Sequence, residues 1–94
     1  MNLNEETLKA IEELAYRLIP PGVIAINIEC DELDFIERLR TPGTEIRTAF
    51  YKGYLRQLIE TRESIIKSAQ NGSNPAQVEL LKFMHEMNNH ILYE

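Results

Sequence analysis

The run from Thr44 to Gln70 constrains the fold more than any other part of the sequence, because it contains no proline and a single glycine, Gly53. Apolar residues recur along it at helical spacing, and charged residues gather on the opposite side. These apolar positions are Phe50, Tyr54, Leu58, Ile65 and Ala69. At 1.5 Å per residue, such a helix spans roughly 40 Å. A compact domain of this size is only roughly 32 Å across. We therefore expect one long amphipathic helix that extends beyond the compact body of a monomer, and we expect the chain to assemble with copies of itself.

Four shorter helices are expected around this long one. Asn4 and Asp31 are suitable N-caps for two of them, and the Asn71-Gly72 pair ends the long helix before Asn74 and Pro75 start the last. The apolar run at 23–28 is taken as a short helix because no second strand-like run could pair with it. The expected ranges are residues 4–19, 23–28, 32–39 and 75–92.

Helical spacing also predicts which side chains point inward. In the first helix these are Leu8, Ile11, Leu14 or Ala15, and Leu18, and in the third they are Leu33, Phe35 or Ile36, and Leu39. The last helix should fold back antiparallel on the long one. The residues expected to face the long helix are Val78, Leu81, Met84 or His85, Met87 or Asn88, and Ile91.

The fold expected is therefore all-α. A helix-turn-helix-like part over residues 1–43 is followed by an antiparallel helical hairpin over residues 44–94, and both belong to one compact unit. A chain of 94 residues has a small core, so self-association would help to stabilise it. No apolar run approaches the ~18 residues that span a membrane, and the single Cys30 suits a reducing compartment. We expect a cytoplasmic protein.

Charge argues against a generally basic nucleic-acid binder, because the formal net charge is -5. The distribution is uneven, with -5 over residues 1–40, +2 over residues 41–70 and -2 over residues 71–94. The long helix and the loop before it are thus the net-positive segment.

Residues 24–30 have the spacing of a helix-turn-helix unit. Ala25 is small enough for close helix packing, and Ile28 is placed for the core. Glu29 stands where such turns usually have glycine, which costs about 1 kcal/mol if the left-handed backbone is kept. The helix that would read the major groove is acidic before it reaches Arg38 and Arg40.

Beyond this unit, residues 48–53 and 62–77 complete a pattern that resembles the small terminase subunits of tailed phages and prophages. The chain has the A-Y-x-x-G-like segment as Ala49-Phe50-Tyr51-Lys52-Gly53, and the A-x-x-G-S-x-x-A turn between Ala69 and Ala76. The resemblance covers roughly residues 5–85. It implies a ring-forming, non-enzymatic protein that recognises phage DNA for genome packaging and works with a large terminase subunit.

Two sets of residues are the candidates for these roles. Phosphates of double-stranded DNA are expected to contact Arg38, Arg40, Arg47 and Lys52. Contacts between copies are expected from Phe50, Tyr54, Leu58, Ile65, Met84 and Ile91. No catalytic residues, metal ligands or cofactor are predicted, because His85 and His90 lie on different helical faces and no nucleotide-binding or nucleophile motif is present.

A second hypothesis belongs to another class. The acidic N-terminal third is also compatible with a helical protein-protein interaction module, or an oligomeric regulator, whose helix-turn-helix no longer reads DNA. Salt-sensitive binding to generic duplex DNA would distinguish the two hypotheses.

Overall fold

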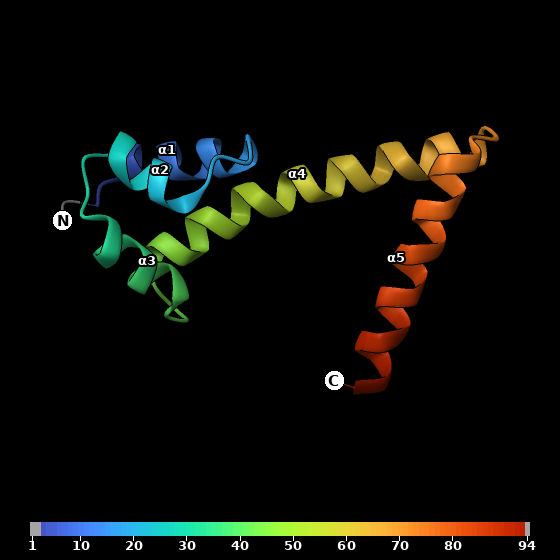
Figure 1. Ribbon diagram of the computed structural model, residues 1–94. Helices are drawn as coiled ribbons and strands as arrows, with labels where there is room; N and C mark the ends of the chain where they lie inside the picture. The colour runs from blue at the N-terminus through green and yellow to red at the C-terminus, as the bar shows by residue number, and fades with distance from the viewer. Residues whose placement is uncertain (1–2, 94) are drawn as a thin grey trace. The chain divides into compact units, whose positions relative to one another are not determined.

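The computed structural model describes residues 3–93, and within this range it contains five α-helices and no strand, so the all-α prediction is confirmed (Figure 1). The start of every helix has a local cause in capping residues or proline, and each lies close to its expected position. The helices are α1 (Glu5–Tyr16), α2 (Pro21–Asn27), α3 (Glu32–Arg40), α4 (Glu45–Gln70) and α5 (Asn74–Tyr93).

The chain divides into two units, and the division lies inside α4. The first unit is Met1–Leu58 and the second is Ile59–Glu94. The sequence suggested two parts, residues 1–43 and 44–94, within one compact unit. The first half of α4 belongs to the N-terminal unit because Ile46 is part of that unit's buried core, with Ala49 and Phe50 packed against it.

The core of the first unit draws side chains from α1, α2, α3 and the start of α4, which lie together in Figure 1. Phe35, Ile11, Ile24 and Ile46 are its largest fully buried side chains. Removing these four side chains from water is the main favourable contribution to folding in this unit, at about 1.5–3 kcal/mol each. The complete cluster is Ile11, Ala15, Ile24, Ala25, Phe35, Leu39 and Ile46.

Two side chains that were expected to point inward are instead exposed. Helix α1 ends at Tyr16, and Leu18 follows it with a left-handed backbone (φ 63°) and 60% of its surface exposed. In α3, Leu33 is 78% exposed. It lies about 160° around the helix from Phe35, which occupies the inward side together with Leu39. The prediction was therefore wrong for Leu18 and Leu33.

Helix α1 approaches α4 at Gly53. A Cβ added to Gly53 would lie 2.8 Å from the carbonyl carbon of Glu12, and closer still to its oxygen. This close approach of the α1 backbone explains why the position has no side chain.

In the second unit, a tight turn joins α4 to α5, and α5 leaves this turn at an angle to α4 (Figure 1). Gly72 provides the left-handed residue at the turn (φ 95°), and the Ser73 hydroxyl accepts a hydrogen bond from the Ala76 N–H at 3.4 Å. Ser73 therefore caps α5, which begins at Asn74. The carbonyl of Ala69 accepts a hydrogen bond from the Gln77 side chain at 3.1 Å.

The face that α5 turns toward α4 differs from the predicted one. Arg62 of α4 lies over the Phe83 ring, 4.2 Å from its centroid, and forms an ion pair with Glu86 at 3.3 Å. Ala76 is buried, and Leu80 and Phe83 are half-buried. The residues expected to make these contacts are exposed instead, because α5 is apolar on two sides and spacing alone could not choose between them. These exposed residues are Val78, Leu81, Met84, His85, Met87, Asn88 and Ile91.

Candidate nucleic-acid interface

The turn between α2 and α3 has a fixed geometry. Glu29 is held in the left-handed region, with φ 56°. The Cys30 N–H donates to the carbonyl of Ala25 at 2.9 Å, and Ala25 itself is fully buried. The Asp31 carboxylate accepts a hydrogen bond from the Asp34 N–H at 3.0 Å, which caps α3 as predicted. Helices α2 and α3 are therefore joined by a short and well-bonded turn.

The outer side of α3 carries more negative than positive charge. Asp31, Glu32 and Glu37 are exposed, and the positive charges come only at the end of the helix. The Arg38 guanidinium donates to the Asp34 carboxylate at 3.3 Å, one helical turn earlier. Of the two arginines predicted on this helix, Arg40 is exposed.

Arg47 lies beside the loop that joins α3 to α4. Its guanidinium donates to the carbonyl of Leu39 at 2.9 Å and lies over the Tyr51 ring at 4.8 Å. The Thr44 hydroxyl ties the loop together, since it accepts from the Arg47 N–H at 3.2 Å and donates to the Arg38 carbonyl at 2.6 Å. The structure therefore brings Arg47 next to the end of α3, where Arg38 and Arg40 are located.

Lys52 lies on another side of α4. Positions 47 and 52 are about 140° apart around a helix. The Lys52 ammonium is 3.9 Å from the Glu12 carboxylate of α1, and its side chain is 74% exposed. The four predicted phosphate contacts therefore do not form one surface: three are associated with the end of α3, and Lys52 is associated with α1.

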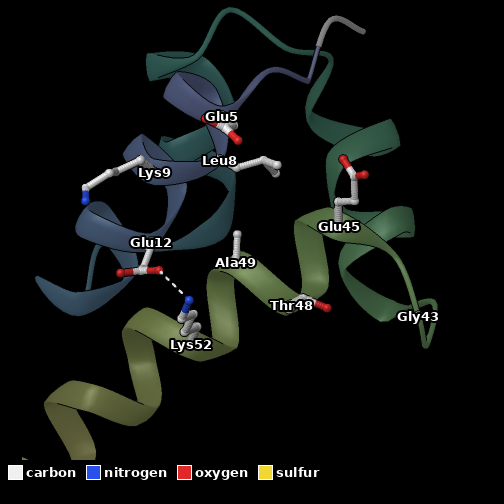
Figure 2. A pocket seen from close by; sticks show the side chains of 9 residues that line it. All are labelled: Glu5, Leu8, Lys9, Glu12, Gly43, Glu45, Thr48, Ala49 and Lys52. Atoms are coloured by element: carbon white, nitrogen blue, oxygen red, sulfur yellow. Dashed lines mark ion pairs between the residues drawn. The ribbon is translucent and has the colours of Figure 1, made fainter.

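An open groove of about 540 Å³ runs between α1 and the start of α4 (Figure 2). Leu8 and Ala49 form its apolar part, and the Glu12–Lys52 ion pair crosses it. Three carboxylates and two ammonium groups line the rest, so the groove does not favour a polyanion such as DNA. The charged lining residues are Glu5, Lys9, Glu12, Glu45 and Lys52.

Arg56 has a role that spacing could not reveal. Its guanidinium donates to Glu12 at 3.2 Å and to Glu13 at 3.3 Å, and it lies over the Tyr16 ring at 4.2 Å. The two glutamates are 44 and 43 positions away in the sequence, so only the fold brings them to α4. Arg56 therefore ties α1 to α4 and is not a free cation of the long helix.

Cys30 is half-buried beside the turn. Burial raises the pKa of the Cys30 thiol, and the nearby carboxylates of Asp34 and Asp31 raise it further. A raised pKa leaves less thiolate at neutral pH, so this environment does not favour a nucleophile. Within residues 3–93, no three acidic, histidine or cysteine side chains are grouped to hold a metal ion.

The residues predicted for assembly have different environments. Phe50 is half-buried against the core of its own unit, whereas Tyr54 is exposed on α4. Leu58 and Ile65 are half-buried. Met84 and Ile91 are both exposed on α5.

No protein-family model matches this chain, and comparisons with curated proteins and with solved structures also give no significant match. In the part of the chain that the structure describes, none of the helices is long and apolar enough to cross a membrane.

Proposed function

We propose that this chain is a non-enzymatic, cytoplasmic DNA-binding protein of the small-terminase kind, which assembles with copies of itself. In this role it recognises double-stranded DNA for genome packaging and passes it to a large terminase subunit. The observation that carries the proposal is the α2–turn–α3 arrangement, with Glu29 left-handed at the turn and Ala25 buried where the two helices meet.

The DNA contacts proposed are restricted to the end of α3 and the start of α4. Arg40 is exposed there, and Arg47 lies across the loop with its guanidinium at the Leu39 carbonyl. The acidic first part of α3 repels phosphates, so each chain offers only a few contacts. Assembly compensates for this, because several weak sites on one oligomer bind a long duplex more tightly than one site does.

A salt titration of duplex DNA binding tests this assignment. Replacing Arg40 and Arg47 together by glutamine should weaken binding and reduce the slope of log K against log salt by about 2, since each lost phosphate contact accounts for about 0.9. Lys67→Gln is the matched control, because Lys67 is an exposed cation near the other end of α4. Circular dichroism checks that the double variant stays folded. The assignment is wrong if binding is equal at every salt concentration.

A second function is favoured by a specific observation. Two of the four predicted cations are already paired within the chain, Arg38 with Asp34 and Lys52 with Glu12. Such pairing suits a protein-protein interaction module or an oligomeric regulator that no longer reads DNA. The same titration separates the two functions, because this one predicts no salt-sensitive binding at tens of micromolar protein.

A further inference from the structure

The outer side of α5 carries a large exposed apolar surface. Six large apolar side chains on this helix are between 54% and 71% exposed, and they lie on the side away from the Phe83 contact or at its border. Scattered single exposed apolar residues are ordinary, but a continuous patch of this kind marks an interaction surface. The six are Val78, Leu81, Met84, Met87, Ile91 and Leu92.

These residues have the spacing of a helix-pairing seam. Leu81, Met84, Asn88 and Ile91 follow one another at intervals of three, four and three, which is the a/d pattern of paired helices. Val78, Met87 and Leu92 flank this seam. No lysine, arginine or carboxylate lies within the seam, since Lys82 and Glu86 are on another side of α5.

We infer that the seam on α5 pairs with the α5 seam of a second copy of this chain. The size of the exposed apolar surface supports a second copy as the partner. Each of the six apolar side chains offers on the order of 100 Å², so together they give roughly 600 Å² on each copy, which is close to the lower limit of a stable interface. A seam without charges can meet itself without like-charge repulsion, whereas DNA would need cations there. This inference rests on the assembly part of the proposed function.

Asn88 indicates how the two helices are aligned. An amide buried in an apolar seam is costly unless it forms hydrogen bonds. When two α5 helices lie parallel and in register, Asn88 meets Asn88 of the partner subunit, and the two amides can satisfy each other. The pair is therefore parallel, with Asn88 near its centre.

Cysteine cross-linking tests this arrangement in the full chain. Asn88→Cys is made in a Cys30→Ser background, because Cys30 is the single native cysteine. Diamide accepts the two electrons when two thiols form a disulfide, which requires Cα atoms within about 7 Å. The expected result is a covalent dimer for Asn88→Cys and little for Asn89→Cys, the matched control one position further around α5. Equal cross-linking at both positions, or none at either, would overturn the parallel pair.

Light scattering over a range of concentrations tests the seam itself. The native chain should have the mass of a multimer, and Leu81→Glu should shift the self-association constant at least 100-fold toward the monomer while the helix content stays unchanged. Asn89→Glu should leave the mass unchanged. A native chain that is monomeric at 100 micromolar would overturn the inference. DNA binding is read separately, so failure at α5 is distinguishable from failure of the Arg40 and Arg47 assignment.

Discussion

One residue on each side of α2 has a left-handed backbone. Leu18 precedes it and Glu29 follows it, with φ values of 63° and 56°. A residue with a side chain loses about 1–2 kcal/mol in this region relative to its normal conformation. Glu29 is kept there because the turn it closes is bonded on both sides, by the Cys30 N–H to Ala25 and by the Asp31 cap. The turn therefore holds strain that glycine would relieve.

Glu29→Gly should stabilise the protein by about 0.5–1 kcal/mol, because glycine adopts this backbone without strain, although it also gains freedom in the unfolded chain. For a chain of this size, the midpoint of thermal unfolding should rise by about 2–8 °C. Differential scanning calorimetry measures the change. Glu37→Gly is the control, since it places glycine in the interior of α3 and should destabilise by about 1 kcal/mol. A destabilised Glu29→Gly variant would show that the Glu29 side chain contributes more than its backbone costs.

Among the elements, α1 and α4 meet where α4 has a glycine, and polar side chains of α4 hold α1 around that point. Gly53 lets the backbone of α1 reach α4 at Glu12, and Arg56 then holds Glu12 and Glu13 from one turn further along. The Arg56 side chain is 41% exposed, so its ion pairs with the two glutamates add only a modest amount to the stability of the fold.

Gly53→Ala should destabilise the first unit by about 1–3 kcal/mol, even though alanine is the better helix former by about 1 kcal/mol. The added Cβ would collide with backbone atoms of Glu12, which cannot move as a side chain could. Chemical denaturation followed by circular dichroism measures the loss. Ser64→Ala, an exposed change on the same helix, should stay within about 0.5 kcal/mol of the native chain. A stabilised Gly53→Ala variant would mean that α1 does not pack closely on α4.

The sequence was a good guide to features that depend on neighbours in the chain. The caps at Asn4 and Asp31 and the stop at Gly72 are local, since each needs only residues within a few positions. The side of a helix that faces its neighbour was harder to predict. Helix α5 is apolar around more than half of its circumference, so its periodicity fits contact through Phe83 as well as contact through Leu81.

In the candidate site, too, only the features that depend on near neighbours in the sequence could be predicted. Glu29 at the turn could be predicted from its place between two helices, whereas the partners of Arg47 and Lys52 could not. Both basic residues lie on the net-positive long helix, and only the packing of α1 and α3 decides which acid or carbonyl each one reaches. Charge counted along a chain does not reveal that pairing.

At the scale of the whole molecule, the two units differ in how much they bury. The first has a core of seven buried side chains, whereas Ala69 and Ala76 are the buried apolar residues of the second within the described range. Two alanines bury little surface, so the second unit gains little stability from its own core. In the proposed assembly, association of copies would add to this stability.

Hydrogen exchange over a range of protein concentrations should therefore separate the units. Amides of α1, α2 and α3 should be protected equally at all concentrations, whereas protection of α5 should increase with concentration as copies associate. Mass spectrometry of exchanged peptides measures both in one sample. The Leu81→Glu variant should lose the concentration dependence in α5 and keep the protection of α1. Equal protection of α5 at all concentrations would show that the second unit is stable alone.

The hydrogen bond from Arg47 to the Leu39 carbonyl has a consequence for binding. That carbonyl lies in the last turn of α3, where carbonyl groups have no partner within the helix, and Arg47 supplies one. A guanidinium has five N–H donors, and the Leu39 carbonyl takes one of them. In the proposed DNA contact, the other N–H groups would be left for the phosphate while the bond to Leu39 fixes the side chain, so the end of α3 would act as the support for an anion contact made from α4.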